Sequence, residues 1–343
     1  MAEFIKWIKI KMVNKQRIGW IDSLRGFCML AILLDHTESY YLDYHIINQN
    51  IYLTDTLILF FILSGFLFYK KKEQNFNIVY KIKSIGRSLL MPYFIFTAIM
   101  SIPKTLVHEK NLNFWEITSN ILLGHASWFI AALILVELLF AFSLWITCEK
   151  IMYMLPICLG TFVLSCCLPN REVCYFWQLD NALQAMLFLF IGYILHQYEE
   201  LIFSLKKRKY LLLLLAMWII LKIWINHEQI IMSIWRIHIS NYPIFIINIL
   251  LSTLTFFSIF RVLPSCKWLE WTGRHCIVYY FLCGGIPLLV GKVFNHLHFA
   301  YQGNYLYVIV VFGVVYLCTS ITTWFIYKYV PFITGQKTRN LKK

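Results

Sequence analysis

An arginine and a histidine stand eleven residues apart in one apolar segment of the chain. Arg25 and His36 belong to the stretch DSLRGFCMLAILLDH, whose middle, from Gly26 to Leu34, is apolar enough to lie inside a membrane. Eleven residues of α-helix make three turns plus about 20°, so the two side chains share one face at a separation of about 16.5 Å. A charge inside a membrane span usually has a function or a partner. The pair therefore points to a long ligand, with an anionic head on Arg25 and a reactive end at His36.

The same spacing also permits a purely structural role. Arg25 would then extend its guanidinium to the membrane surface, and His36 would pack against a neighbouring helix through one hydrogen bond. The nearby acids do not decide between the two interpretations. Asp35 is turned about 100° from His36, and Glu38 lies almost opposite His36 on an ideal helix. Glu38 is expected to meet His36 only if the helix ends before it.

The composition indicates the class of protein that holds these residues. Of 343 residues, 60% are hydrophobic and 14% are charged, whereas about one-quarter of a soluble globular chain is charged. The apolar residues fall in runs that approach or exceed the roughly 20 residues needed to span a bilayer. We expect an all-α polytopic membrane helix bundle with about ten spans, near residues 20–40, 52–69, 85–103, 120–146, 151–168, 181–197, 210–225, 242–260, 276–294 and 305–330.

The basic residues predict the orientation of these spans. If the amino terminus is cytoplasmic, the inner segments hold 22 lysines and arginines and the outer loops hold four. Such an excess in short loops marks the cytoplasmic side, so both termini are expected there. The chain then divides into a basic lead-in at residues 1–19, a transmembrane domain at residues 20–331 and a basic tail at residues 332–343. The lead-in lacks the continuous apolar core of a cleavable signal.

Charge and cysteine usage exclude two other classes of protein. The net charge of +14 is concentrated between the expected spans, which is a membrane-topology signature and not the basic stripe of a nucleic-acid-binding protein. The ten cysteines include no C-x-x-C spacing, so neither a zinc site nor a disulfide framework is indicated. We expect no bound metal.

Four segments, in order, resemble one known family. Arg25, ten further residues and His36 resemble the first-span signature of the acyltransferase 3 family, membrane-bound O-acyltransferases that modify bacterial carbohydrates. The later segments LFFILSGFLFYKKK, GRSLLMPYF and HASWFIAALI resemble the family's next three spans. The family often has two arginines three residues apart before the proline, whereas Ser84 stands three residues before Arg87 here. Lys83, four residues before Arg87, would share its face on a regular helix.

This resemblance implies an integral-membrane O-acetyltransferase of the cell inner membrane. It implies transfer of an acetyl group from acetyl-CoA, a co-substrate and not a bound cofactor, to a hydroxyl of a cell-surface or lipid-linked polysaccharide. His36 suits the general base, because a histidine can accept a proton near neutral pH; an acyl-histidine intermediate is the alternative. Arg25, Lys83 and Arg87 would hold the CoA phosphates.

Two aromatic residues are expected at the acceptor. Trp128 would stack on a sugar or on the adenine ring, or simply pack, and His125 stands just before it. Ser64 and Gly65 are expected to allow close helix packing, Glu137 to have a partner on another helix, and Lys222 to extend to the membrane surface.

Two other functions fit ten spans with buried charges. One is a transporter or flippase for a glycan or its lipid carrier, and the other is a structural or regulatory subunit of a polysaccharide assembly system. Transporters commonly show inverted repeats with matching broken helices, and the sequence shows no evident pair of this kind. Activity of the purified protein with labelled acetyl-CoA distinguishes an enzyme from both.

Overall fold

The computed structural model describes residues 18–69, 76–107, 113–168, 173–203, 208–299 and 301–335. The lead-in up to residue 17 and the tail from residue 336 lie outside the described residues. The described elements, in chain order, are α2 Gly19–Leu42, α3 Gln49–Phe68, α4 Ile78–Ile85, the π-helix η1 Gly86–Leu90, α5 Met91–Val107, α6 Phe114–Leu122, α7 Trp128–Ile146, α8 Ile151–Cys167, the 3₁₀ turn η2 Phe176–Gln178, α9 Leu179–Gln197, α10 Glu199–Ile202, α11 Arg208–His227, β1 Met232–Ser233, β2 His238–Ile239, α12 Tyr242–Val262, α13 Lys267–Arg274, α14 Cys276–Leu282, α15 Ile286–His296, α16 Leu306–Tyr329 and the 3₁₀ turn η3 Pro331–Thr334.

The described elements confirm the all-α bundle and include several helices that can cross a membrane. Six helices have the length and hydropathy for a span, and the bent pair α14 and α15, which meet at 47°, would make a seventh; the six are Gln49–Phe68, Trp128–Ile146, Phe176–Gln197, Lys209–His227, Tyr242–Val262 and Leu306–Tyr329. α8 is apolar but shorter, and α2 has 24 residues but carries four charged ones. The count of ten crossings and the cytoplasmic termini stay predictions.

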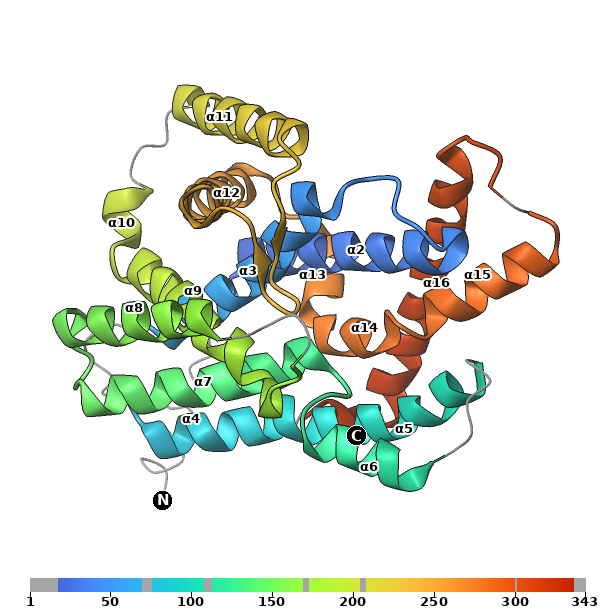
Figure 1. The fold of residues 1–343 in the computed structure, drawn as a ribbon, viewed down its shortest axis with the longest axis horizontal. Helices are drawn as coiled ribbons and strands as arrows, with labels where there is room; N and C mark the ends of the chain where they lie inside the picture. Colours follow the sequence, from blue (N-terminus) through green and yellow to red (C-terminus); the bar gives the residue numbers. More distant parts are fainter. Residues whose placement is uncertain are drawn as a thin grey trace, which may run out of the picture.

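Helix α2 lies inside the bundle. It runs through the middle of the molecule in Figure 1, and it contacts α3, α12, α13, α14, α15 and α16. Its residues Leu24, Cys28 and Leu33 are completely buried. Because neighbouring helices surround α2, its polar side chains face protein or a cavity and avoid the cost of contact with lipid.

Close backbone contact joins α3 to α9. A Cβ atom added at Gly65 would lie 1.9 Å from the carbonyl oxygen of Leu189, and one added at Gly192 would lie 1.9 Å from that of Ile62. Neither position therefore accepts a larger side chain without separating the helices. Small residues permit such approaches in membrane bundles, and the packing role expected for Gly65 is confirmed.

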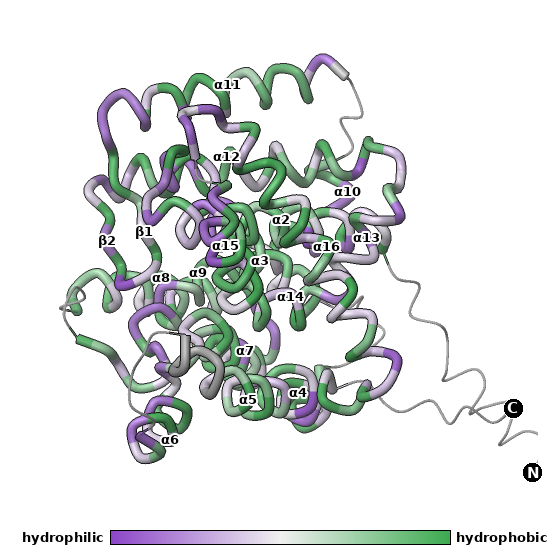
Figure 2. The backbone as a smooth tube through the Cα atoms, turned by 90° about the vertical axis from the view of Figure 1, so that its right-hand side faces the viewer, coloured by the Kyte–Doolittle hydropathy of each residue, from purple (hydrophilic) through white to green (hydrophobic). Residues whose placement is uncertain are grey.

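Helix α11 presents an apolar surface at the periphery of the bundle. Only 11% of the spanning window of α11 is buried inside the protein. Figure 2 shows α11 at the edge of the molecule, with mainly apolar residues between polar ends. An apolar exposed face of this kind suits contact with lipid.

The expected spans near 85–103, 120–146 and 276–294 each contain an irregular segment. In the first, the ring of Pro92 cannot continue the ordinary hydrogen-bond pattern, and the Met91 amide bonds the carbonyl of Gly86, five residues back, in a π-helical turn. In the second, Gly124 has φ +81° between α6 and α7. The third is the bend between α14 and α15.

Candidate active site

A cavity of about 1310 Å³ lies beside the C-terminal half of α2. Its walls also include the N-terminal part of α3, the connection between α6 and α7, the β1–β2 hairpin and the bend between α14 and α15. Side-chain amides line it alongside aromatic and aliphatic groups, among them Asn48, Gln49, Asn50 and Asn120. A cavity of this size accommodates a large ligand.

His36 is one of the cavity-lining residues. It lies on the C-terminal half of α2, where its half-buried ring stacks on the ring of Tyr40 at a centroid distance of 6.0 Å. Because Gly19–Leu42 is one unbroken helix, the prediction that Arg25 and His36 share a helix is confirmed. A histidine at a cavity wall has the access that proton transfer to a bound ligand requires.

The buried carboxylate of Asp35 holds the start of α3 and the segment before it. Its Oδ1 atom accepts hydrogen bonds from Gln49 Nε2 at 2.8 Å and from the Tyr52 hydroxyl at 3.2 Å. His45 Nδ1 lies 3.4 Å from the same oxygen, and Gln49 Nε2 lies 3.1 Å from His45 Nε2. Asp35, His45 and Gln49 all line the cavity, so this polar cluster forms part of the wall. The sequence interpretation did not single out His45, whose only local signal is a polar loop after an apolar helix.

Glu38, which is completely buried, holds the segment after α2. It accepts hydrogen bonds from the Ile46 amide at 3.1 Å and from the Tyr305 hydroxyl. Burial, followed by the hydrogen bond to Glu38, raises the pKa of Tyr305, so the phenol remains the donor. Since α2 continues past Glu38 to Leu42, the condition for a contact between Glu38 and His36 is not met.

His125 and Trp128 also line the cavity, at the break between α6 and α7. The His125 amide bonds the Asn120 carbonyl at 2.8 Å, which closes the C-terminal turn of α6. The Nε2 atom of His125 is buried and has no hydrogen-bond partner among the described residues. Trp128 begins α7 and is half-buried, with its ring in an edge contact with Phe129. The structure thus brings His36, His125 and Trp128 to one cavity.

A strained turn before α9 contributes a further acid that the sequence analysis missed. Trp177 and Gln178 have φ values of 49° and 55°, and the left-handed region costs about 1–2 kcal/mol for a residue other than glycine. The Trp177 amide bonds the Leu123 carbonyl at 2.8 Å and its Nε1 bonds the Leu122 carbonyl at 3.0 Å, which fixes this turn against the α6–α7 connection.

Two residues after Gln178, at the start of α9, the carboxylate of Asp180 lines the same cavity. Asp180 is 3% exposed, and its Oδ1 atom has no hydrogen-bond partner among the described residues. An unpaired buried polar atom of this kind costs roughly 1–3 kcal/mol. In the sequence, the signal that could have identified Asp180 was an acidic residue in the first turn of an apolar helix.

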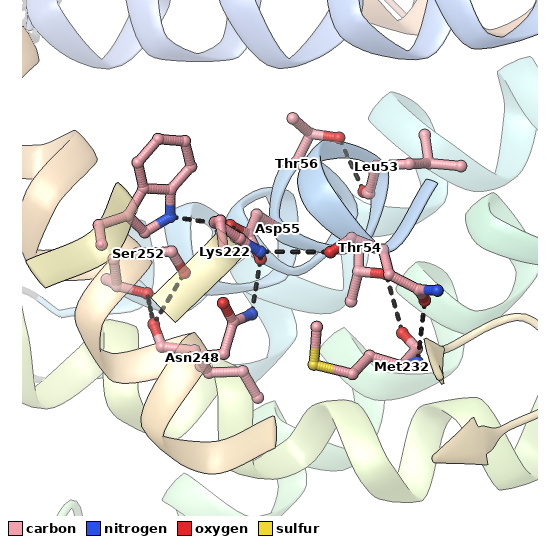
Figure 3. A network of polar contacts seen from close by, with 12 residues as sticks. Leu53, Thr54, Asp55, Thr56, Lys222, Met232, Asn248 and Ser252 are labelled. Atoms are coloured by element: carbon pink, nitrogen blue, oxygen red, sulfur yellow. Dashed lines mark hydrogen bonds and ion pairs between the residues drawn. The ribbon is translucent and has the colours of Figure 1, made fainter. Parts of the chain in front are cut away.

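A buried ion pair lies behind the hairpin wall (Figure 3). Lys222 Nζ on α11 is 2.9 Å from the carboxylate of Asp55 on α3, which also accepts from Asn248 Nδ2 at 2.7 Å and from Trp218 Nε1 at 3.2 Å. The expectation that Lys222 extends to the membrane surface is wrong, because its side chain is only 5% exposed. At this position the ammonium group of Lys222 is stabilised more by the buried Asp55 carboxylate than by contact with the membrane surface.

The same end of α3 anchors the hairpin itself. The Thr54 hydroxyl donates to the Met232 carbonyl at 2.8 Å, and the Met232 amide donates to Asn50 Oδ1 at 2.9 Å. Lys222 Nζ adds a contact of 3.3 Å to the Asn50 carbonyl. The ion pair and the hairpin wall are therefore connected through α3.

Arg25 is placed apart from the cavity wall. It is half-buried near the N-terminal end of α2. Asp22, one turn before it, is paired with Arg274 at 3.1 Å. In the described part of the chain no ion pair includes Arg25. Its positive charge is therefore not neutralised by any of those carboxylates.

Lys83 and Arg87 are exposed and do not line the cavity. Lys83 lies on α4, and Arg87 lies in the π-helical turn Gly86–Leu90. A π-helical turn begins between them, at Gly86, so the two residues do not lie on one regular α-helix. The sequence predicts a regular helix here, and the structure has a π-helical turn instead. The donor-binding role of both residues stays a prediction.

Glu137 has the helix partner that was expected. Its carboxylate accepts a hydrogen bond from the Ser64 hydroxyl on α3 and lies 2.9 Å from Lys81 Nζ on α4. Lys81 Nζ also lies 3.6 Å from the ring centroid of Phe68. These contacts give Glu137 and Lys81 a role in joining α3, α4 and α7.

These observations define the class of protein: a helix bundle with membrane-spanning helices and with a histidine on the wall of a large, partly open cavity. The chain belongs to the acyltransferase 3 family: the family model, described as an acyltransferase domain, matches residues 18–324. The resemblance in the first 140 residues thus extends over nearly the whole chain. No curated protein and no solved structure matches it. Family membership supports an acyltransferase activity with an acyl donor and an acceptor.

Proposed function

We propose that the protein transfers an acetyl group from acetyl-CoA to a hydroxyl of a cell-surface or lipid-linked polysaccharide at the cell inner membrane. The observation that supports this most directly is the arrangement along α2. His36 lines a cavity of about 1310 Å³, and Arg25, on the same unbroken helix, has a charge that no described carboxylate pairs. The helical rise separates them by about 16.5 Å, which suits a donor with phosphates at one end and a reactive thioester at the other.

In the proposed reaction, His36 acts as the general base. The acceptor hydroxyl attacks the carbonyl carbon of the thioester while His36 takes the hydroxyl proton. The tetrahedral intermediate then collapses, the carbon–sulfur bond breaks, and the CoA sulfur leaves with the proton from His36. A histidine has the proton affinity for both transfers near neutral pH. An acyl-histidine intermediate would place the acetyl group on the ring first, and rapid quenching of labelled enzyme separates these routes.

The donor phosphates would meet Arg25, Lys83 and Arg87. Guanidinium groups bind phosphate oxygens through two parallel hydrogen bonds, and lysine supplies a compact positive charge. Lys83 and Arg87 are exposed and so are accessible to a soluble donor. In the topology of ten spans with cytoplasmic termini, all three residues lie toward the cytoplasm, where acetyl-CoA is found.

The acceptor would occupy the amide-lined part of the cavity. Trp128 offers an aromatic face, and His125 offers a ring nitrogen without a partner among the described residues. Asn and Gln side chains both donate and accept hydrogen bonds, which suits a sugar with many hydroxyl groups.

Labelled acetyl-CoA tests the proposal. The protein purified in detergent is incubated with acetyl-labelled donor and with polysaccharide from cells lacking the gene product, and glycan mass spectrometry follows acetylation. We expect label in the glycan and loss of label with His36→Gln. Detergent removes the two compartments, so a transporter or flippase yields no acetylated glycan in this assay. Absence of label with well-folded protein would overturn the proposed activity.

A further inference from the structure

Asp180 is a buried acid of the cavity wall to which neither the proposed acyl transfer nor the donor site gives a role. It is 97% buried, it lines the cavity, and its Oδ1 atom has no hydrogen-bond partner among the described residues. Its carboxylate lies against the backbone amides of Asp180 and Asn181 at the start of α9, so part of its hydrogen-bonding capacity is used and part remains. A buried carboxylate oxygen left unpaired is costly unless a ligand supplies the donor.

The turn before α9 fixes the position of Asp180. Two consecutive residues in the left-handed region, Trp177 and Gln178, direct the chain into α9. Gly124 accommodates this turn, since a Cβ atom there would lie 2.7 Å from the Cα of Trp177. Backbone strain of this kind persists only where the surroundings enforce it, and it gathers at ligand sites.

The enforced turn also joins Asp180 to the segment of His125. Trp177 bonds the carbonyls of Leu122 and Leu123, immediately before Gly124 and His125. His125 lines the same cavity and has its own unpartnered Nε2 atom within the described residues. The α6–α7 connection and the first turn of α9 are fixed to each other, and each therefore contributes one polar group with unused hydrogen-bonding capacity.

The chemistry of the two groups indicates the ligand. An ionised carboxylate only accepts hydrogen bonds, whereas a neutral imidazole nitrogen donates or accepts according to its tautomer. The unpartnered Oδ1 atom of Asp180 needs a hydrogen-bond donor, which an ionised phosphate or carboxylate on the ligand lacks. Hydroxyl groups satisfy both residues, because each hydroxyl can donate to Asp180 or accept from His125. A sugar ring supplies several hydroxyls in a fixed geometry.

We propose that Asp180 and His125 form a subsite for the hydroxyl groups of the acceptor sugar, in which Asp180 accepts a hydrogen bond from the ligand and thereby selects the hydroxyl that reaches His36. This deepens the proposed function and rests on it for the identity of the acceptor. Asp180 is a positioning residue, since the acetyl group does not pass through it. Its substitution is expected to change acceptor binding and the site of acetylation, with the donor KM unchanged.

The test measures sugar binding without acetyl-CoA. Methyl hexopyranosides and their monodeoxy analogues are titrated by saturation-transfer NMR into purified wild-type protein, Asp180→Ala, Asp180→Asn and the control Asp43→Asn. Asp43 is an exposed residue with φ 61°, a conformation that Asn tolerates, and it does not line the cavity. We expect Asp180→Ala to weaken binding about tenfold, as removal of a hydrogen bond to a charged group does, Asp180→Asn to weaken it less, and Asp43→Asn to match wild type.

One monodeoxy sugar should lack the hydroxyl that Asp180 holds. Wild type should bind this sugar more weakly than its parent sugar, by the same factor by which Asp180→Ala weakens binding of the parent. Asp180→Ala should bind the monodeoxy sugar no more weakly than the parent, because the hydrogen bond is already absent. Thermal unfolding of each variant establishes that it is folded. Equal binding by wild type and folded Asp180→Ala, or no binding of any sugar to wild type, would overturn the subsite. Asp180-dependent sugar binding without acetyl transfer would leave the subsite standing and instead refute the proposed function.

Discussion

Asp55 on α3 and Lys222 on α11 form an ion pair of 2.9 Å whose side chains are 1% and 5% exposed. The pair joins α11, which has the smallest buried share of the candidate spans among the described residues, to the interior, and it lies next to the anchor of the β1–β2 hairpin. Removing one partner leaves the other charge buried and unpaired, whereas removing both does not.

Lys222→Met is expected to destabilise the protein by about 3–5 kcal/mol, because it isolates the Asp55 carboxylate. The double variant Asp55→Leu with Lys222→Met should recover much of that loss. Lys209→Met is the matched control, since Lys209 is exposed on the same helix. Thermal unfolding in detergent provides the comparison, and a double variant less stable than Lys222→Met alone would contradict the ion-pair account.

His36→Gln is expected to lower acetyl transfer by about 10²–10⁴-fold, because glutamine retains hydrogen bonding but cannot accept the proton. His36→Ala should be at least as inactive, and both variants should remain folded. His296→Gln, an exposed histidine away from the cavity, should keep wild-type rates. The packing alternative makes the opposite prediction, that His36→Gln stays active while His36→Ala loses stability, and initial rates together with unfolding temperatures separate the two.

Arg25→Ala is expected to raise the KM for acetyl-CoA strongly, and Arg25→Lys to raise it less. Lysine retains the charge but lacks the planar pair of donors that binds phosphate. The acceptor KM should stay near wild type. Initial rates at varied acetyl-CoA measure this, and an unchanged donor KM in folded Arg25→Ala would exclude Arg25 from the donor site.

Arg87→Ala is expected to weaken use of the donor with little effect on stability, because Arg87 is exposed; Lys83→Ala should have the same effect to a smaller degree. Lys328→Ala is the matched control, an exposed cation near the C-terminal end of α16. Donor KM and protein yield are both measured. If Arg87→Ala and Lys328→Ala raise the donor KM equally, the effect is general surface charge and not a phosphate site.

The ten-span topology is open to reporter fusions. Reporters placed after residues 45, 175 and 235 are expected on the outer side of the membrane, because the inner segments carry most of the lysines and arginines. A reporter at the carboxyl terminus is expected in the cytoplasm. Cytoplasmic signals at two of the three outer positions would overturn the predicted orientation.

The sequence by itself determined the class of the bundle and the shared helix of Arg25 and His36. Both depend on local properties, since apolar runs select membrane spans and helical periodicity relates residues on one segment. The resemblance in the first segments also identified the family to which nearly the whole chain belongs.

Tertiary structure alone decided which groups meet. Asp55 and Lys222 are 167 positions apart, and the expectation for Lys222 failed because nothing in its own segment reveals a carboxylate on α3. Asp180 joins the cavity of His36 and His125 only through the fixed turn at Trp177 and the packing of α9 on α3. Such partners depend on how helices from distant segments cross, and the interlocking of side chains that determines each crossing is not expressed in the hydropathy or periodicity of one segment.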